Sequence, residues 1–364
     1  MIHLISCSPV GKNKPVFNWS EYGVIPDTDG TPSLGFAGPV SGISNNILFV
    51  AGGANFPDSM PWMGGKKKYY DQAYTTDTDP QNHSFKRYTF PYKVAYSANC
   101  STPSGIICAG GEDENGPLSN VILIQFTESI PIYISLPALP VAITNAAATA
   151  IDNNIYIAGG ETINATSTLF FKLDLKDTIR NWQQLPDIPH AVSHTILLSC
   201  NKEKIFLIGG RRKTERGISE LYNNLFEYDI NTGKWIEKAP LPYPLSAGTG
   251  AIINDDYIAM FGGDKGNVFR KTEQLITAIR KEPDSTKRKR LTEEKKELQT
   301  THPGFSNEIL LYNIKNDSWA TGGNIPFKVP VTTTAVTKGD KVWIPSGEIK
   351  AGIRSPKILE ATIK

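Results

Sequence analysis

The chain has 364 residues and a formal net charge of +2, from 38 Lys and Arg against 36 Asp and Glu. So small a charge offers little attraction to polyanions, which argues against a nucleic-acid partner. Hydrophobic residues make up 40% of the chain, but no run approaches the roughly 18 apolar residues of a membrane-spanning helix. The 31 Gly and 25 Pro instead predict many turns and a β-rich globular protein.

The N-terminal extension, residues 1–16, carries an incomplete export signal. Its Leu4-Ile5-Ser6-Cys7 segment resembles a lipoprotein cleavage site, but only Met1-Ile2-His3 precedes it. A secretory signal needs a basic segment and about 7 to 15 apolar residues before that site. Either the true start lies upstream and Cys7 is a lipid anchor, or the match is accidental in a cytoplasmic protein. We expect a periplasmic or lipid-anchored protein.

Cysteine and histidine spacing predicts no metal site. The four Cys form no CxxC pair, and the five His form no HxH or HExxH pattern. Cys100 and Cys108 flank a turn-like STPSG segment and could face each other across a hairpin. We expect two unpaired thiols in strands there, and we expect no cofactor.

Apolar runs that end in a pair of glycines recur along the chain. Each run is short and bounded by turn residues, which is typical of a buried strand. The pairs are Gly52-Gly53, Gly110-Gly111, Gly159-Gly160, Gly209-Gly210 and Gly262-Gly263, with Ser346-Gly347 as a degenerate sixth.

A second marker is an aromatic residue followed seven positions later by Pro. From that Pro to the next Gly pair the distance is 19 or 20 residues in five copies and 26 in the first. With aromatic pairs such as Tyr228 and Trp235, these markers form the Kelch repeat signature. Six units of about 50 residues predict a six-bladed β-propeller, folded as a single domain over residues 1–364. The marker pairs are Trp19/Pro26, Tyr133/Pro140, Trp182/Pro189, Trp235/Pro242 and Trp319/Pro326, with Phe85/Pro91 one residue shorter.

The ends of the chain predict how the ring closes. Only 17 residues follow the last Gly pair, enough for a third strand at 358–363 but not for a fourth. We expect residues 17–26 to supply that outer strand of the last blade. Small residues at 35–38, 145–148, 246–250 and 332–335 suit innermost strands, where the axis leaves little room.

One face of the propeller carries the variable loops. The distance from a Gly pair to the next aromatic marker ranges from 23 to 57 residues, whereas the opposite side barely varies. The longest insertion, residues 270–304, is rich in Lys, Arg and Glu with helical spacing. Its KRKR run is followed by several Glu residues. This mixture of charges favours a solvated helix surface over a nucleic-acid patch. We therefore expect a short helical insertion beside the mouth of a pocket.

The residue after the Gly pair is charged in five of the six units. Each charge alone fits a structural ion pair, but five of them around one axis favour a polar pocket. These residues are Glu112, Glu161, Arg211, Asp264 and Glu348, with Ala54 as the exception.

The most specific local feature is the loop Gly347-Glu348-Ile349-Lys350-Ala351-Gly352-Ile353-Arg354. It resembles the G-E-x-K-x-G-x-R motif of the bacterial N-acetylneuraminate (sialic acid) mutarotases, which are six-bladed Kelch propellers. The segments 35–38, 51–54 and 67–69 also resemble that family. Their order along the chain differs, as in a cyclically permuted branch.

The resemblance implies a mutarotase that interconverts the α and β anomers of N-acetylneuraminic acid by general acid-base catalysis, without metal or cofactor. It implies that Glu348 is the proton acceptor and Arg354 the essential arginine, which we expect to hold the carboxylate of the substrate. Two departures stand out: Pro345-Ser346 precedes the motif, and His190 occupies a position where arginine is expected. We expect a monomer. Further substrate-binding candidates are Lys350, Glu112, Glu161, Arg211 and His190.

Three other functions are open to a propeller of this kind. A non-catalytic Kelch module would use the same loops to bind a protein or a glycan. A sialidase needs Asp-box turns, and Asn231-Thr232-Gly233-Lys234-Trp235 has the wrong spacing for one. A copper-radical oxidase needs a His and Tyr ligand set that the sequence does not offer.

Overall fold

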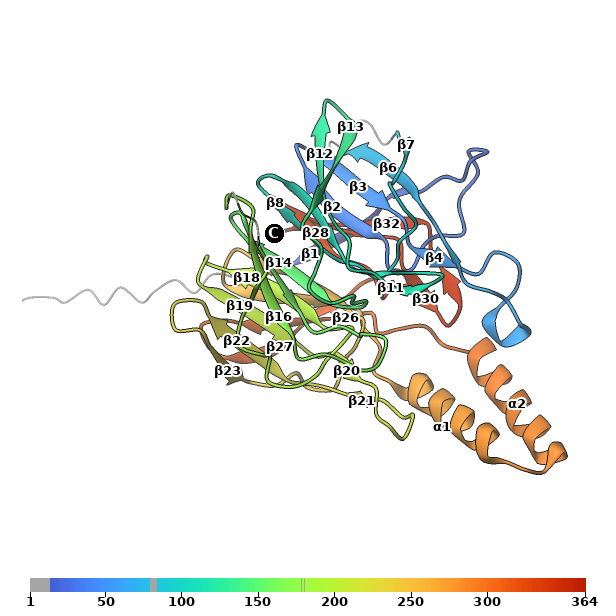
Figure 1. Cartoon of the computed structure of the whole chain (residues 1–364). Coiled ribbons are helices and arrows are strands. Elements are labelled where there is room, and N and C mark those ends of the chain that lie inside the picture. The colour runs from blue at the N-terminus through green and yellow to red at the C-terminus, as the bar shows by residue number, and fades with distance from the viewer. Residues whose placement is uncertain (1–13, 79–83, 178, 180) are drawn as a thin grey trace, which may run out of the picture.

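The computed structural model describes residues 14–78, 84–177, 179 and 181–364. Within them, six four-stranded antiparallel sheets form the blades of a propeller (Figure 1), which confirms the predicted fold. Cys7 and the export signal lie outside the described residues. No helix in the described part of the chain is long and apolar enough to cross a membrane.

Blades 1 to 3 follow one another along the chain, each running from its inner to its outer strand. Blade 1 contains β2 (Val40–Ser44), β3 (Ile47–Ala51), β6 (Gln72–Asp77) and β7 (Lys86–Thr89); blade 2 contains β8 (Ala98–Thr102), β9 (Gly105–Ala109), β12 (Val121–Thr127) and β13 (Ile130–Leu136); blade 3 contains β14 (Ala147–Ile151), β15 (Asn154–Ala158), β16 (Phe170–Asp174) and β17 (Gln183–Gln184).

Blades 4 to 6 repeat the pattern, and the last one joins both ends of the chain. Blade 4 contains β18 (Ile196–Cys200), β19 (Lys204–Ile208), β22 (Leu225–Asp229) and β23 (Lys234–Lys238); blade 5 contains β24 (Thr249–Ile253), β25 (Tyr257–Phe261), β26 (Glu308–Asn313) and β27 (Ser318–Asn324); blade 6 contains β28 (Val336–Lys338), β29 (Lys341–Pro345), β32 (Lys357–Ile363) and β1 (Phe17–Val24).

The hydrophobic core lies between neighbouring blades. The second strand of blade 1, ILFVA, is buried along its whole length because other blades cover both of its faces. Its Phe49 packs edge-on against Phe126 of blade 2, with ring centroids 5.8 Å apart. A single blade could not bury such a strand, so the blades stabilise one another.

The Gly pairs are needed because the chain entering the next blade passes directly over them. Gly110 has a φ of +62°, and a Cβ there would lie 2.4 Å from the carbonyl oxygen of Ile143. Gly111 donates its N–H to that same carbonyl at 2.9 Å. Ser346 replaces the first glycine in blade 6, and its buried hydroxyl contacts the backbone N–H and carbonyl of Phe36 instead. The degenerate sixth pair thus keeps the same contact between blades.

The ring closes as predicted, with β1 as the outer strand of blade 6. It pairs with β32 from Phe17 opposite Ile363 to Val24 opposite Lys357. Phe17 and Trp19 also pack edge-on against Phe261 of blade 5, with centroids 5.5 and 5.4 Å apart. Both ends of the chain therefore hold the last blade in place.

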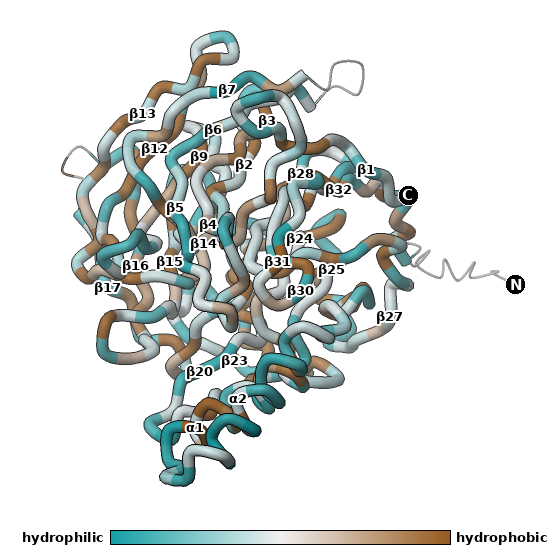
Figure 2. The backbone as a smooth tube through the Cα atoms, turned by 90° about the vertical axis from the view of Figure 1, so that its right-hand side faces the viewer, coloured by the Kyte–Doolittle hydropathy of each residue, from teal (hydrophilic) through white to brown (hydrophobic). Residues whose placement is uncertain are grey.

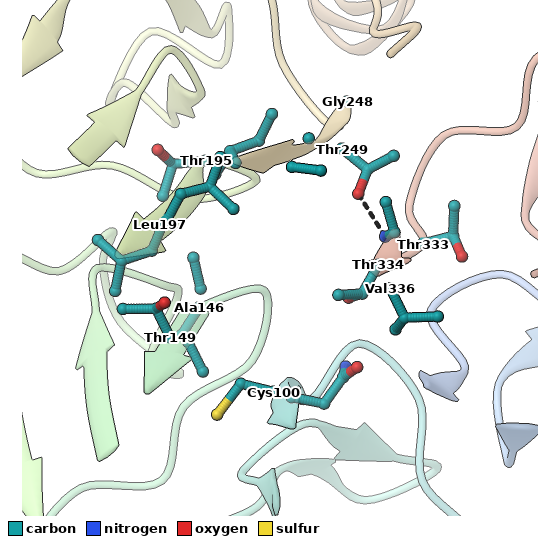
Figure 3. Close-up of a pocket in the computed structure, with 18 of the residues that line it drawn as sticks. Cys100, Ala146, Thr149, Thr195, Leu197, Gly248, Thr249, Thr333, Thr334 and Val336 are labelled. Carbon is teal, nitrogen blue, oxygen red and sulfur yellow. Dashed lines mark hydrogen bonds between the residues drawn. The ribbon is translucent and has the colours of Figure 1, made fainter. Parts of the chain in front are cut away.

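A cavity of about 300 Å³ runs between the inner strands of blades 2 to 6 and the segment before β2, and it is lined mainly by small and polar residues (Figure 3). Residues 145–148, 246–250 and 332–335 contribute to this lining, as expected from their size. In the segment 35–38 only Gly38 does so, because Phe36 is buried against Tyr70. That segment leads into blade 1 and is not its inner strand.

The charged insertion forms two helices, α1 (Asn267–Lys281) and α2 (Ser285–Thr300), that project from blade 5 (Figure 1). The first helix begins at Asn267, slightly before the predicted boundary. Leu275 is its buried residue, whereas no residue of α2 is buried and that helix is mainly hydrophilic (Figure 2). Asp284 caps α2 by accepting a hydrogen bond from the N–H of Lys287.

Cys100 and Cys108 lie on the neighbouring strands β8 and β9 as free thiols. They are not opposite each other, since Cys108 faces Asn99 and Cys100 faces Ile107. The expectation of unpaired cysteines in strands is therefore confirmed.

Candidate functional site

The six residues that follow the Gly pairs occupy equivalent places on one face of the ring. Each forms an isolated antiparallel bridge with the segment that leads into its own blade, as Glu112 does with Ala95 and Glu348 with Val331. Small hairpins and the helical insertion extend from the same positions, so we call this side the insertion face. Its hairpins are β4 (Ala54–Asn55) with β5 (Lys68–Tyr69), β10 (Glu112–Asp113) with β11 (Gly116–Pro117), β20 (Arg211–Arg212) with β21 (Glu220–Leu221), and β30 (Glu348–Lys350) with β31 (Ile353–Arg354).

Glu348 and Arg354 meet across the β30–β31 hairpin. Arg354 Nη1 lies 3.4 Å from Glu348 Oε1, and the N–H of Gly352 donates to the same oxygen at 2.9 Å. Arg354 is buried, stacks on the ring of Phe56, and donates from Nε to the carbonyl of Ala54 in blade 1 at 3.3 Å. Glu348 keeps 20% of its side chain exposed. The hairpin thus presents an accessible carboxylate that an almost inaccessible guanidinium holds in place.

Glu112 forms a second group between blades 1 and 2. It accepts hydrogen bonds from Lys67 Nζ at 3.1 Å and from the hydroxyl of Tyr69 at 2.7 Å. Thr144, on the way into blade 3, donates to its other oxygen at 3.2 Å. These bonds account for most of the acceptor capacity of Glu112.

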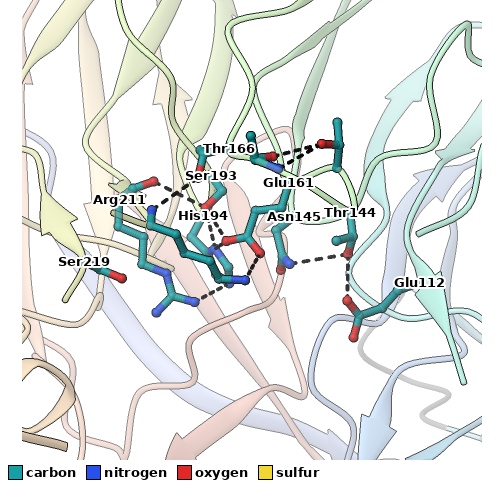
Figure 4. A network of polar contacts seen from close by, with 12 residues as sticks. Glu112, Thr144, Asn145, Glu161, Thr166, Ser193, His194, Arg211 and Ser219 are labelled. Atoms are coloured by element: carbon teal, nitrogen blue, oxygen red, sulfur yellow. Dashed lines mark hydrogen bonds and ion pairs between the residues drawn. The ribbon is translucent and has the colours of Figure 1, made fainter. Parts of the chain in front are cut away.

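A buried polar chain joins blades 3 and 4 (Figure 4). Glu161 accepts from Ser193 Oγ at 2.8 Å and from Lys213 Nζ at 2.7 Å. Nδ1 of His194 lies 3.1 Å from Ser193 Oγ, and Nε2 of His194 lies 3.2 Å from Nη2 of Arg211. A guanidinium can only donate, so Nε2 accepts and the imidazole hydrogen sits on Nδ1. The donors therefore point one way along the chain: Arg211 donates to His194, His194 donates to Ser193, and Ser193 donates to Glu161.

Burial and neighbouring charges fix the ionisation of this chain. Burial lowers the pKa of His194 well below its usual value, and the charge of Arg211 adds to the effect. Burial alone would raise the pKa of Glu161, but the His194, Lys213 and Arg211 side chains lower it to about 2. A neutral imidazole thus lies between a guanidinium and a carboxylate at neutral pH.

Arg211 connects this chain to the Glu348 hairpin. Burial lowers the pKa of Arg211, and the carboxylates of four surrounding residues oppose that shift. One of them is Glu348, which also acts, with Asp264, on the buried His302. The structure therefore brings groups from blades 3 to 6 together on the insertion face. The four carboxylates around Arg211 belong to Glu161, Glu273, Asp264 and Glu348.

The other predicted site residues lie in different surroundings. His190 stacks on Tyr222 with ring centroids 4.0 Å apart and also packs against Phe226. Lys350 is partly exposed on β30 and lies close enough to His302 to influence its pKa. No group of three or more His, Cys, Asp or Glu suited to a metal ion occurs among the described residues.

Several contacting residues carry no signal in the sequence alone. His194 lies in a linker at a φ of +53°, outside any motif, and Lys213 reaches Glu161 from another blade. The helical insertion is expected beside the pocket, but no sequence pattern predicts that its Phe269 contacts Arg211. In the structure the ring of Phe269 stacks on the guanidinium of Arg211 at 4.2 Å. Only the pairing of blades reveals these contacts.

A profile of known sequences described as N-acetylneuraminate epimerase matches residues 136–364, more than half of the chain. The chain belongs to the N-acetylneuraminate epimerase family. The matched part runs from the end of blade 2 through blades 3, 4 and 5 to the C-terminal strands of blade 6, and it includes Glu348 and Arg354.

Individual members of the family are distant in sequence. An N-acetylneuraminate epimerase of Pasteurella multocida is 27% identical over 229 residues, which are 62% of this chain and 58% of that protein. The enzyme of the same name from Haemophilus influenzae is 24% identical over 220 residues, 60% of this chain and 57% of that protein. The match thus spans less than two thirds of the length of these relatives.

A solved structure described as "Structure of YjhT" superimposes with a TM-score of 0.65. It is 14% identical and covers 91% of this chain and 97% of its own. At that identity the likeness bears on the fold, and it agrees with the propeller of this family member.

Proposed function

We propose that this protein is a mutarotase that interconverts the α and β anomers of N-acetylneuraminic acid. The observation that carries the proposal is the contact between Glu348 and Arg354, within the family motif, on the face where groups from four blades gather. Family membership supports the class of substrate. The geometry supports acid-base chemistry, because an accessible carboxylate is fixed by two hydrogen bonds.

Ring opening needs one proton removed and one delivered. In the proposed reaction Glu348 takes the proton of the anomeric hydroxyl, and the electrons of that O–H bond form the carbonyl. The bond between the anomeric carbon and the ring oxygen breaks, and its electron pair goes to the ring oxygen, which takes a proton from Glu348 directly or through water. Closure on the opposite face of the carbonyl reverses these steps and gives the other anomer.

Arg354 supports this role by its position. It donates to Glu348 and to the carbonyl of Ala54, and so connects the base in blade 6 to the backbone of blade 1. A charge-assisted hydrogen bond of this kind orients a carboxylate. The expectation that Arg354 also holds the carboxylate of the substrate stays a prediction.

The test follows the approach to anomeric equilibrium by proton NMR, starting from the freshly released α anomer. Replacing Glu348 by Gln keeps the shape but removes the base, and we expect the catalysed rate to fall by about 10²- to 10⁴-fold. Glu114→Gln is the matched control, because Glu114 is an exposed glutamate on the same face that pairs with Lys93. Equal rates for the wild type and Glu348→Gln would remove Glu348 from the mechanism. A wild type that leaves the spontaneous rate unchanged would refute the proposed activity.

A further inference from the structure

Arg211 differs from most other cations of the insertion face in having no carboxylate within ion-pair distance among the described residues. Lys67 pairs with Glu112 at 3.1 Å, Lys213 with Glu161 at 2.7 Å, and Arg354 with Glu348 at 3.4 Å. The adjacent Arg212 pairs with Glu220 at 2.7 Å. The four carboxylates that act on Arg211 do so from a longer range.

The surroundings of Arg211 hold its side chain in place without neutralising it. On one side Nη2 donates to the neutral His194. On the other, the ring of Phe269 lies 4.2 Å from the guanidinium carbon, so the aromatic face covers one side of the guanidinium plane. Its Nε is buried and has no hydrogen-bond partner in the part of the chain that the structure describes. A desolvated guanidinium with unused donors is costly, and a bound anion would remove that cost.

The clamp on Arg211 comes from the neighbouring blade. Phe269 belongs to α1 of blade 5, and the same helix is fixed to blade 4 by Glu273, which accepts hydrogen bonds from the backbone N–H and the hydroxyl of Ser219 at 2.7 and 2.8 Å. The base of the insertion is therefore part of the site, whereas α2 has no buried residue.

We propose that Arg211, clamped by Phe269 of α1, is the receptor for the carboxylate of the substrate. The inference rests on the proposed function for the identity of the sugar acid and gives it a second anchor. Arg354 then serves to orient Glu348, and the acid binds between two arginines with separate tasks. A carboxylate fits the planar fork of Arg211 through two parallel hydrogen bonds.

The experiment compares N-acetylneuraminic acid with its methyl ester, which lacks the negative charge. For the wild type and each variant, kcat/KM for anomer interconversion is measured with both compounds, and binding of the acid is measured by calorimetry. We expect Arg211→Gln to weaken binding of the acid by about tenfold or more and to abolish the preference for acid over ester. Arg211→Lys keeps the charge without the fork and should recover part of that preference.

Five further variants separate this role from others. Arg212→Gln removes a neighbouring arginine that is already paired. It should change neither the affinity for the acid nor the preference for acid over ester. Phe269→Leu should lower the preference for the acid with little change in kcat, whereas Ile276→Ala, at a position 40% exposed on the same helix, should not. Arg354→Gln and Lys350→Gln test the rival cations; loss of acid preference in either, with preference retained in Arg211→Gln, overturns the inference.

The outcomes also distinguish this inference from the proposed function. A wild type that binds the acid without interconverting its anomers refutes the proposed activity, while weaker binding by Arg211→Gln in that protein still supports the receptor. A wild type that interconverts the anomers while Arg211→Gln keeps full acid preference refutes the receptor alone. No binding of the acid by the wild type refutes both.

Discussion

His194 shows how much a single side chain of this molecule depends on its surroundings. Its backbone has a φ of +53°, the residue contributes to the lining of the central cavity, and both ring nitrogens are engaged, one by Ser193 and one by Arg211. Protonation would place a second cation against the guanidinium. The ring therefore stays neutral in the folded protein at a pH where a free histidine titrates.

This arrangement predicts a loss of stability in mild acid. Below about pH 6.5 the unfolded chain binds a proton at His194 that the folded chain does not. The free energy of unfolding therefore decreases as the pH is lowered. One such group gives a slope of up to about 1.4 kcal/mol per pH unit. Urea unfolding between pH 7.5 and 5.5 measures it, and His194→Asn, which tolerates a positive φ, should have a smaller slope. An identical slope in the variant would contradict the assignment.

Glu161 adds a second acid-sensitive range. Its pKa of about 2 in the folded protein lies below the usual value, so the stability it contributes is present above about pH 4.5 and is lost as the pH falls towards 2. The two ranges are separate, and unfolding curves recorded below pH 4.5 report on Glu161. Glu161→Gln should flatten that part of the profile and leave the part above pH 5.5 unchanged.

At this scale the sequence predicts some residues and not others. Glu348 and Arg354 are found because their spacing within one loop matches a known motif, and the structure brings them into contact. The partners of Glu161 and Arg211 come from other blades, where no spacing along the chain reports on distance in space. His190 is predicted because it occupies a position where arginine is expected, but the histidine that contacts Arg211 is His194.

At the scale of elements, the two helices of the insertion differ in their contacts. The first, α1, contacts blade 4 through Glu273, whereas α2 has no buried residue. Removing both helices should therefore leave the propeller folded. Replacement of residues 267–303 by a short Gly and Ser linker, which retains Gly266 and Gly304, should shift the thermal midpoint by no more than a few degrees. The same variant should bind the sugar acid more weakly, because Arg211 loses Phe269.

Circular dichroism on heating and calorimetry together check this expectation. A large fall in the midpoint would make the insertion a structural element of blade 5. Unchanged binding of the acid would contradict the role of α1. The sequence predicts that these residues are helical and lie beside the pocket, because their charge and spacing are local properties. It does not predict the stacking of Phe269 on Arg211, because that contact depends on how two blades meet.

At the scale of the whole molecule, the fold was accessible from the sequence because it is a repeat. The Gly pair and the aromatic marker recur six times, and each copy indicates the same local geometry. The strand that the last blade lacks at the C-terminal end is supplied by β1 from the N-terminal end. The role of Ser346 was not accessible, because its hydroxyl contacts a residue at the opposite end of the sequence.

The closing strand predicts a large effect of a small deletion. Without residues 1–26 the ring loses the buried Tyr22 and Ile25 and exposes the edge of β32. Each buried side chain is worth about 1.5 to 3 kcal/mol, against a total of about 5 to 15 for a typical domain. Thermal unfolding should therefore begin well below the wild-type midpoint. Tyr22→Ala should reproduce part of the loss, and Ser20→Ala, an exposed position in the same strand, should not; an unchanged midpoint in the deletion would contradict closure by β1.

The pairing of β1 with β32 also has a consequence for biosynthesis. More than 300 residues separate these two strands, and at about 5 to 20 residues per second the delay between their synthesis amounts to tens of seconds. During that time β1 has no strand to pair with, and the ring of blades stays open. We expect this waiting period to be when the newborn chain most needs a chaperone.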